Sequence, residues 1–392
     1  MLQSDYIENL IGIKDIIVTS VSQTDFELHI FFEMKKVEHK CPHCEAHTEY
    51  IHDYRKQVIK EVSAFGKTTY LHLRKRRYIC KHCGKKFYEN TPFLPRYHRM
   101  TKRLISSIIN EMKSTYSLKS VAARANVSTP TVCRVFKYVS YSLTKLPRVL
   151  SIDEFKGNTE EGKYQCIITD PHNRKVLDIL KSRESNSLID YFKQFDNRKD
   201  VKYFVMDMWK PYKDIAETFF KSATIVIDKY HFIRQVMWAF ERVRIIEQKK
   251  FAKGRRIYFK RSKKLLLKRM RTLTSEDKSA VEVMLQVSQR LKEAYLLKEK
   301  FLEFVDSKDL YEAKKNLLAW YLYVDISNVP EFDECSKTIK NWEKYILNSF
   351  TCPYTNGYTE GCNNKIKVLK RNSYGVRNFE RFRSRILHMM AS

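Results

Sequence analysis

The stretch that decides the fold is Val149-Leu150-Ser151-Ile152-Asp153, a short apolar run that ends in an acid. A second run, Tyr203-Phe204-Val205-Met206-Asp207, repeats this pattern. Short apolar runs of this kind are typical of buried strands. Strands that are neighbours in a sheet bring their ends within several ångströms, where two carboxylates repel each other unless cations intervene. An acid at a strand end is also a common turn residue, so each aspartate taken alone has a purely structural interpretation.

Further runs around these two predict a mixed α/β core. We expect strands at 149–155, 164–169, 176–180, 201–206 and 224–227. The later strands are separated by helical spacing at 188–195 and 212–220, and residues 233–348 are helical almost throughout. The tail, 356–390, reads as basic helix with a break near Ser373-Tyr374-Gly375.

The two aspartates favour divalent metal chemistry. Two ions roughly 3.5–4 Å apart would relieve the repulsion and clamp an in-line phosphoryl displacement. Hard oxygen ligands suit Mg²⁺ or Mn²⁺ and not zinc. A third acid, Glu360, falls in the first turn of the predicted tail helix. It is either a ligand delivered against the sheet or an acid stabilised by the helix dipole.

Two cysteine pairs predict a structural zinc site. Cys41-Pro-His-Cys44 and Cys80-Lys-His-Cys83 each supply two thiolates, and four thiolates close a tetrahedral shell. The alternative is inert or redox cysteines, with a disulfide scaffold improbable in a chain of 392 residues without a secretory signal. The segment between the pairs is long enough for a hairpin, with a strand over 67–77.

The segment 118–135 fits a helix-turn-helix. Asn126 occupies the turn, and Ser128-Thr129-Pro130 opens the second helix with a cap and a proline. Thr131, Arg134 and Lys137 would then face outward for groove contact. An ordinary helical hairpin has similar spacing and is the alternative.

The charge of the chain indicates a polyanionic partner. Lys and Arg number 74 against 45 Asp and Glu, so the formal charge is 74 − 45 = +29. Such a surface speeds encounter with nucleic acid. With no apolar run near the ~18 residues that span a bilayer and no signal-like start, we expect a soluble intracellular protein.

The strings 151–155 and 206–209 and the segment 356–367 together resemble the bacterial insertion-sequence transposases of the ISL-three group, in the DDE superfamily. The similarity covers essentially the whole chain, including the cysteine pairs and the helix-turn-helix. It implies a ribonuclease H-like α/β catalytic core interrupted by an all-helical insertion. On that basis Asp153, Asp207 and Glu360 match the catalytic acids, and all three would hold magnesium. Asp228-Lys229-Tyr230-His231 resembles an acid-x-x-His element of related families, so His231 either assists catalysis or is a satisfied histidine at a strand-to-helix corner.

Basic and aromatic residues complete the expected DNA-binding surface. The helix after Glu360 carries Lys365, Lys367, Lys370 and Arg371, which are placed to hold a phosphate backbone or are simply a solvated helix face. Trp209 and Trp238 are candidates for stacking on a flipped base, although buried core positions are the simpler expectation for both.

We therefore expect a multidomain α+β DNA transposase with one structural Zn²⁺ and two active-site Mg²⁺ or Mn²⁺ ions. The expected segments are an N-terminal zinc-ribbon region (1–98), a helix-turn-helix (99–145), the first part of the core (146–232), a helical insertion (233–350) and a core-closing helix with the third acid (351–392). Its partners would be transposon terminal inverted repeats, target DNA and a second copy of the chain, in the bacterial cytoplasm near the nucleoid. The alternatives are a non-catalytic DNA-binding regulator and a metal-dependent nuclease without strand transfer.

Overall fold

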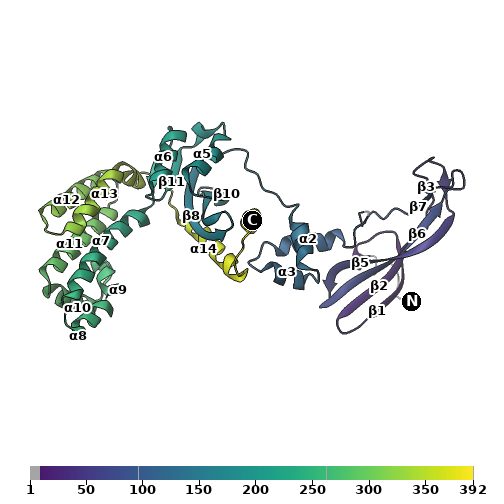
Figure 1. Cartoon of the computed structure of the whole chain (residues 1–392), viewed down its shortest axis with the longest axis horizontal. Coiled ribbons are helices and arrows are strands. Elements are labelled where there is room, and N and C mark those ends of the chain that lie inside the picture. The colour runs from purple at the N-terminus through teal and green to yellow at the C-terminus, as the bar shows by residue number, and fades with distance from the viewer. Residues whose placement is uncertain (1–8, 96, 262, 392) are drawn as a thin grey trace. The chain divides into compact units, whose positions relative to one another are not determined.

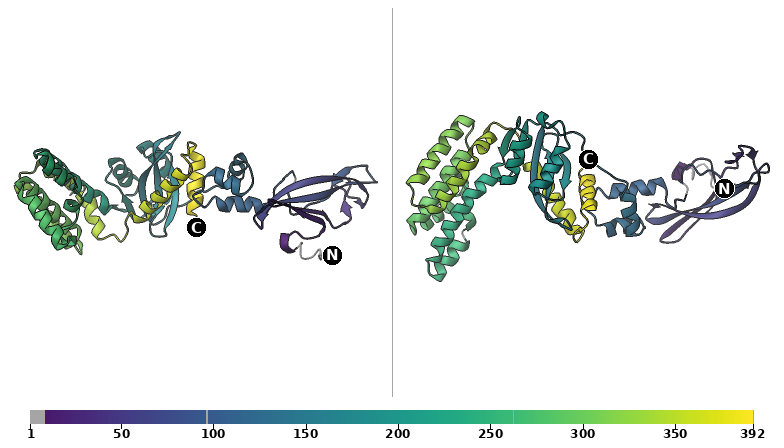
Figure 2. Two further views of the ribbon diagram at one scale, coloured as in Figure 1. Left: turned by 90° about the horizontal axis from the view of Figure 1, so that it is seen from below. Right: turned by 45° about the horizontal axis from the view of Figure 1, so that its top comes forward.

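The computed structural model describes residues 9–95, 97–261 and 263–391, which form two compact units. The first unit runs to residue 140 and includes 371–374, and the second holds 141–370 and the remainder of the tail. Figure 1 labels the elements, and Figure 2 shows them from two further directions.

The first unit is built on an antiparallel hairpin joined to two more strands. Its main sheet has the order β1-β2-β6-β5, with β2 and β6 parallel and the short β7 added to β6. The tight turn between β5 and β6 holds Phe65 and Gly66, both with positive φ, as a two-residue hairpin turn requires. The strands are β1 (Ile16–Gln23), β2 (Glu27–Met34), β5 (Ile51–Ala64), β6 (Lys67–Ile79) and β7 (Lys86–Tyr88).

Three short helices follow this sheet, and they confirm the predicted helix-turn-helix. They are α2 (Lys102–Glu111), α3 (Leu118–Arg124) and α4 (Thr129–Phe136). Asn126 has φ +48° in the turn, a left-handed conformation that asparagine tolerates. The Ser128 hydroxyl accepts a hydrogen bond from the Thr131 N–H, as an N-cap does. Val121 and Val132 are fully buried where α3 and α4 pack together.

The second unit contains a five-stranded mixed sheet, and all five predicted strands are present. Its order is β10-β9-β8-β11-β12, with β8, β9 and β10 antiparallel in sequence and β11 parallel to both β8 and β12. The strands are β8 (Val149–Thr159), β9 (Gly162–Asp170), β10 (Lys175–Leu180), β11 (Tyr203–Met206) and β12 (Thr224–Ile227). Because β11 lies beside β8, the two predicted acid-bearing strands are neighbours.

Helices cover both faces of this sheet, as Figure 1 shows. On one face α5 (Ser185–Lys193) and α6 (Lys210–Phe219) contribute Leu188 and Ile215 to a core that includes Ile152 of β8. On the other face α14 (Gly357–Asn372) and α15 (Phe379–Met390) pack against Ile167 of β9. The predicted break in the tail is present between them, where Tyr374 and Gly375 both have positive φ.

The segment between β12 and α14 is helical, as expected. Its helices are α7 (Lys229–Lys249), α8 (Lys253–Arg261), α9 (Lys263–Leu267), α10 (Ser275–Gln286), α11 (Gln289–Val305), α12 (Leu310–Ile326) and α13 (Pro330–Leu347), with short 3₁₀ turns at Met270–Thr272 and Asn348–Phe350. The helix α7 starts directly after β12 and continues without interruption through residues 232 and 233.

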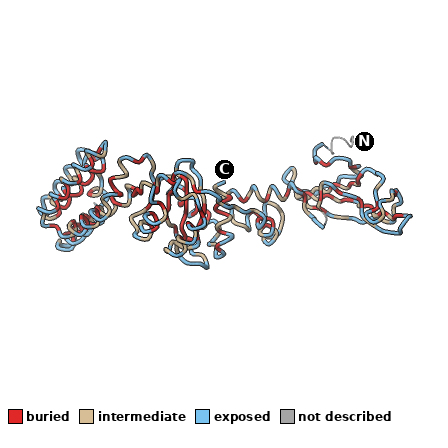
Figure 3. Tube along the Cα trace, turned by 90° about the horizontal axis from the view of Figure 1, so that it is seen from above, coloured by how far each residue is buried: buried red, intermediate tan, exposed pale blue. Residues whose placement is uncertain are grey.

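A buried lysine stabilises the packing of this helical segment. The Lys298 side chain is fully buried, and its ammonium donates to the main-chain oxygens of Leu266 and Lys268 at 2.9 Å each. It also pairs with Glu299 at 2.6 Å. Each charged donor bond to a buried carbonyl prevents a desolvation penalty of about 1–3 kcal/mol. Figure 3 shows buried and exposed residues alternating along the packed helices of the segment, whereas the residues of α8 whose burial is described are exposed.

One tryptophan expectation is wrong. Trp209 is half-buried against the core, but Trp238 is 51% exposed on α7, where its ring leaves the packed face of the helix. None of the described helices is both long enough and apolar enough to span a membrane.

Candidate functional site

Three aspartates gather where β8, β11 and β12 run parallel. Asp153 lies within β8 and is 8% exposed, Asp207 directly follows β11, and Asp228 follows β12 and caps α7. The expected strand end at Asp153 is not present, because β8 continues to Thr159. In the parallel pairing of β11 with β8, Val205 lies opposite Ser151, so Asp207 leaves β11 level with Asp153. The arrangement brings together Asp153 and Asp207, which the sequence predicted, and adds Asp228.

Asp153 is held in a site that disfavours its charge. Its Oδ2 accepts from the Asn363 amide at 2.8 Å and its Oδ1 from the Glu154 N–H at 2.7 Å. Burial, and then the nearby Asp207 carboxylate, raise the pKa of Asp153 to about 8. Two carboxylates in this position are a favourable binding site for a cation, because a divalent ion offsets both the cost of burying the charge and the repulsion between the carboxylates.

His231 and Asn356 fix the second aspartate. The His231 Nε2 lies 2.7 Å from Asp207 Oδ1, and the Asn356 amide approaches the same oxygen at 3.4 Å. Asn356 also donates its main-chain N–H to Asp228 at 2.9 Å. Below them Ser151 bonds to Asn356 and, at 3.0 Å, to Thr359 of α14. This network ties the start of α14 to the strands that carry the acids.

Glu360 lies in the first turn of α14, as predicted, and is exposed. Burial and the Asp228 carboxylate, followed by Asp207, raise its pKa, while His231 opposes the shift. Glu360 therefore faces the same electrostatic field as the aspartates. Its oxygens do not join those of Asp153 and Asp207 in a set with all ligand atoms within 4.8 Å of each other, and in the described part of the chain only the four cysteines form such a set.

The site contains three residues that the sequence analysis did not predict as part of it: Asp228, Asn356 and Asn363. Asp228 was noticed only as part of the acid-x-x-His element, and the two asparagines are ordinary helix-start and helix residues in the sequence. Asn363 lies three residues after Glu360 on α14, a spacing that places both side chains on neighbouring positions of one helix face. That spacing was the one available signal.

The four cysteines form a second candidate metal centre. The sulfur of Cys41 lies 3.6 Å from that of Cys83, and Cys44 lies 3.5 Å from Cys80. Four thiolates about 2.3 Å from one ion have sulfur separations near these values. Burial opposes ionisation of Cys41, but the N–H groups of Cys44 and His43 outweigh it and lower its pKa to about 7.

The two cysteine pairs sit on similar turns. In each, the N–H of the residue after the second cysteine, Glu45 or Gly84, donates to the carbonyl of the first cysteine, and both of these residues have positive φ. The first turn joins β3 (His39–Lys40) to β4 (His47–Thr48), and the second joins β6 to β7. Sulfur donors alone, in a closed set, fit a structural Zn²⁺.

The predicted DNA-contacting side chains lie on helix surfaces. On α4 and its end, Arg134 and Lys137 are exposed and Thr131 is half-buried. On α14, Lys365, Lys367 and Arg371 are exposed, whereas Lys370 is half-buried and donates to the main-chain oxygen of Lys156 at 2.6 Å. The Lys370 ammonium therefore also anchors α14 to β8.

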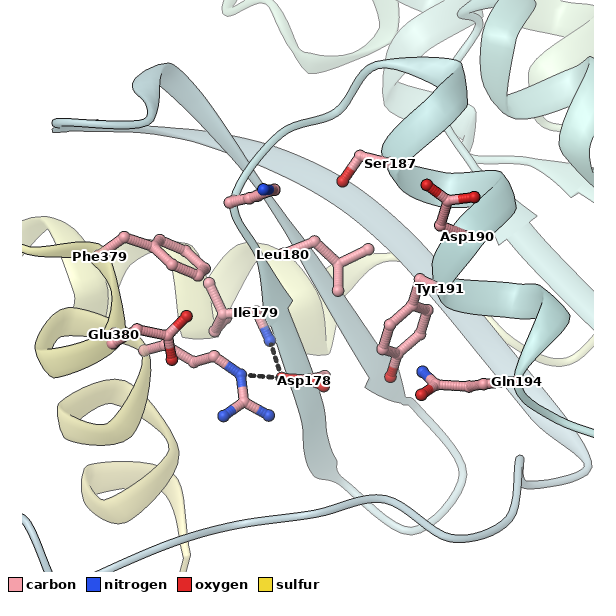
Figure 4. A pocket seen from close by; sticks show the side chains of 11 residues that line it. Asp178, Ile179, Leu180, Ser187, Asp190, Tyr191, Gln194, Phe379 and Glu380 are labelled. Atoms are coloured by element: carbon pink, nitrogen blue, oxygen red, sulfur yellow. Dashed lines mark hydrogen bonds and ion pairs between the residues drawn. The ribbon is translucent and has the colours of Figure 1, made fainter.

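A cavity lies away from the acids described above. It has a volume of about 480 Å³ and is formed by β10, α5 and α15, none of which carries a proposed catalytic residue. The Asp178 carboxylate and the Arg383 guanidinium, 2.6 Å apart, form an ion pair at this cavity. Figure 4 shows Asp178, Tyr191 and Gln194 among the side chains that line it.

Comparisons with known proteins identify the family. Residues 150–386, more than half of the chain, match the family model of the DDE transposases of the ISL3 group. The chain belongs to the ISL3 transposase family. Residues 38–83 match the zinc finger of the transposases IS204/IS1001/IS1096/IS1165, and residues 89–140 match the helix-turn-helix domain of transposase family ISL3.

Two curated proteins are similar to this ISL3 family member. The transposase for insertion sequence element IS1001 of Bordetella parapertussis is 26% identical over 358 residues, which is 87% of this chain and 86% of that protein. A protein of Lactococcus lactis subsp. lactis named ATP-dependent protease is 35% identical over 116 residues, which is 29% of this chain and 35% of that protein. The chain is a DNA transposase with a zinc ribbon, a helix-turn-helix and a DDE-family catalytic domain.

Proposed function

We propose that this transposase cuts transposon ends by metal-dependent hydrolysis and joins the freed 3′-hydroxyl to target DNA, with Asp153, Asp207 and Glu360 as its catalytic acids. The observation that carries the proposal is that Asp153 is buried beside Asp207: burial first, and then repulsion by the Asp207 carboxylate, raise the pKa of Asp153 to about 8. A structural acid in a sheet gains nothing from this repulsion, whereas a cation-binding acid does. Glu360 shares their field from the first turn of α14.

The sheet supports a ribonuclease H-like core. Three antiparallel strands followed by two strands parallel to the first, in the order β10-β9-β8-β11-β12, are the layout that the resemblance implies. Helices on both faces, Asp153 within the central strand β8 and Asp207 directly after β11 agree with it. We propose that residues 146–232 and 351–392 form this core and that 233–350 are an insertion, preceded by the zinc-ribbon region (1–98) and the helix-turn-helix region (99–145).

The chain's own groups have distinct parts in this mechanism. Asp153, Asp207 and Glu360 would hold one or two Mg²⁺ or Mn²⁺ ions, which would supply charge neutralisation and an activated oxygen nucleophile. His231 would keep the Asp207 carboxylate oriented through its 2.7 Å contact, and Asn363 would do the same for Asp153. No side-chain nucleophile is required, because water and then the DNA 3′-hydroxyl attack phosphorus.

Basic and aromatic side chains would place the DNA. Lys365, Lys367, Lys370 and Arg371 extend from Glu360 along α14, where they would contact phosphates, and Thr131, Arg134 and Lys137 would face the groove at the recognition helix. On α7, the Arg234 guanidinium lies over the rings of both Tyr230 and Trp238, at 5.4 and 4.6 Å from their centroids. Both rings are more than half exposed, so an unpaired base could stack on either of them.

The decisive experiment compares wild type with Asp207→Asn in Mg²⁺-dependent nicking of a duplex that carries the element's end, with Asp190→Asn as control. Asp190 is an exposed acid on α5, outside the cluster. We expect nicking by wild type and Asp190→Asn, and a loss of at least ~100-fold in Asp207→Asn at unchanged DNA affinity.

Two other results would favour the rivals. If all three proteins bind the duplex but leave it uncut, the regulator is the better interpretation. If pre-cut ends with a free 3′-hydroxyl are never joined to a second duplex while nicking persists, the protein is a nuclease without strand transfer. We also propose that two copies act together, because two ends must be held at once.

A further inference from the structure

The helix α12 carries an apolar stripe on its solvent side. Tyr311, Leu318, Leu322 and Ile326 are 81%, 62%, 59% and 79% exposed. On the opposite side of the same helix, Leu317 and Trp320 are buried against the neighbouring helices α11 and α13. A helix that is apolar on both sides is expected to be covered on both sides.

The exposed side chains follow the spacing of a helix-pairing seam. Positions 311, 315, 318, 322 and 325 are separated by four, three, four and three residues. This alternation keeps one edge of a helix against a partner helix over several turns. Lys315 and Asp325 are exposed and flank the two leucines of the seam, and Tyr311 lies one turn before Lys315.

The placement of these charges identifies the partner. In a parallel pair of identical helices, Lys315 would face Lys315 and Asp325 would face Asp325, which is repulsive at both ends. In an antiparallel pair, the two-fold axis can pass between Leu318 and Leu322. Leu318 of each copy then lies opposite Leu322 of the other copy. Lys315 then lies opposite the partner's Asp325, because each is three residues beyond a leucine. The seam is therefore self-complementary under two-fold symmetry.

We propose that α12 is a self-association surface, on which the helix pairs antiparallel with α12 of a second copy of this chain. A hollow of about 210 Å³ opens beside Leu318, between α12 and α13, and is lined by Lys314, Tyr321 and Lys340 among others. It can receive an apolar side chain of the opposing helix. Asp325 also lies 4.0 Å from Lys340, a weak intramolecular contact that leaves it free to pair.

Nucleic acid fits this surface less well. An apolar stripe that ends in an exposed carboxylate lacks the continuous positive charge that phosphate contacts need. Stable dimers bury at least ~1,200 Å² in total, and this seam is only one helix wide. We therefore expect association that depends on concentration and strengthens when both copies hold linked DNA. The inference deepens the proposed pairing of two copies but does not rest on the cleavage chemistry.

Sedimentation velocity of the full-length, zinc-loaded protein over a concentration series tests the proposal. Measurements in moderate salt screen the self-repulsion of the +29 charge. Leu318→Asp should weaken self-association at least ~10-fold. The matched control is Leu296→Asp on α11, an apolar residue that is 49% exposed outside the seam, and it should leave self-association unchanged. Circular dichroism establishes that each variant is folded.

Exchanging the charges of Lys315 and Asp325 distinguishes the antiparallel pairing of α12 from any other contact between two copies. Lys315→Asp and Asp325→Lys should each weaken association, and the double variant should recover most of it, because the exchanged charges again meet their opposites. A wild type that stays monomeric at all concentrations would overturn the proposal. So would a double variant as weak as the single ones, or a Leu318→Asp protein that associates normally. The proposed cleavage reaction would survive each of these results, since nicking by the acids is measured separately.

Discussion

Replacement of Asp153 by Asn should stabilise the protein when no divalent ion is bound. The Asp153 carboxylate is 8% exposed and lies beside Asp207, and these two causes raise its pKa from 3.8 to about 8. A group with a raised pKa in the native state keeps its proton more tightly there than in the unfolded chain. Its contribution to the free energy of unfolding is therefore favourable at low pH and is lost as the pH rises from about 4 to 8.

The structure sets the size of the effect. A shift of roughly four pKa units corresponds to ~6 kcal/mol if no relaxation occurs. Water entry and side-chain movement at the sheet edge reduce this, and we expect a gain of ~1–3 kcal/mol at pH 8. Asn also fits the local hydrogen bonds. Its oxygen can accept from the Glu154 N–H. Its amide can donate to the Asn363 Oδ1, a buried oxygen without a hydrogen-bond partner, once the Asn363 amide has turned over, because the Asn363 Nδ2 faces this position in the wild type.

Urea unfolding in EDTA at pH 5 and pH 8 measures the effect. From pH 5 to pH 8, the free energy of unfolding of the wild type should decrease relative to that of Asp153→Asn. Millimolar Mg²⁺ should then raise the stability of wild type by ~1–3 kcal/mol and leave the variant nearly unchanged. Asp178→Asn is the control with the opposite sign, because Asp178 is a buried acid of the same sheet that is paired with Arg383.

Two outcomes would refute this reasoning. One is a variant that is less stable than wild type at pH 8 in EDTA. That result would mean that the Asp153 carboxylate increases the free energy of unfolding. The other is an equal response of wild type and variant to Mg²⁺, which would place the ion elsewhere.

The zinc ribbon, the helix-turn-helix and the buried lysine can each be tested by substitution. Each chain should carry one zinc by atomic absorption, and Cys80→Ser should lose it together with DNA binding; a variant that keeps both would mean that the cysteines do not bind metal. Ser128→Ala should destabilise the helix-turn-helix by ~1 kcal/mol in thermal melts, and Arg134→Ala should reduce the salt slope of DNA binding by ~1, whereas an unchanged slope would remove Arg134 from the interface. Lys298→Met should lower the free energy of unfolding by ~1–3 kcal/mol, since two buried carbonyls and Glu299 lose their donor; a neutral result would show that water replaces it.

Local patterns in the sequence were sufficient for most elements. The β-branched runs of β8–β12, the turn at Asn126 and the break at Tyr374-Gly375 all depend on residues close together in the chain, and the structure has them where they were predicted. Trp238 was placed wrongly because local spacing does not reveal which face of α7 lacks a neighbour.

The site was only partly predictable. Asp153 and Asp207 could be paired from the sequence because each ends an apolar run. The expected strand end at Asp153 is wrong, since β8 continues to Thr159, but the parallel register pairs Val205 with Ser151 and so still places Asp207 level with Asp153. Asn356 and Asn363 could not, since their importance comes from α14 lying across that edge, far along the chain from the strands. Glu360 was found through its helix position, but its approach to the aspartates depends on the same packing.

The sequence by itself determined the thiolate set of the zinc ribbon, the caps and turns of the recognition helices, and the alternation that buries each strand, because these follow from bonding and sterics over a few residues. Only the tertiary structure decided which acids share one electrostatic field, which lysine is buried in the helical segment, and which side of α12 remains uncovered. Those properties arise from contacts between segments far apart in the chain, whose free energies no local pattern contains.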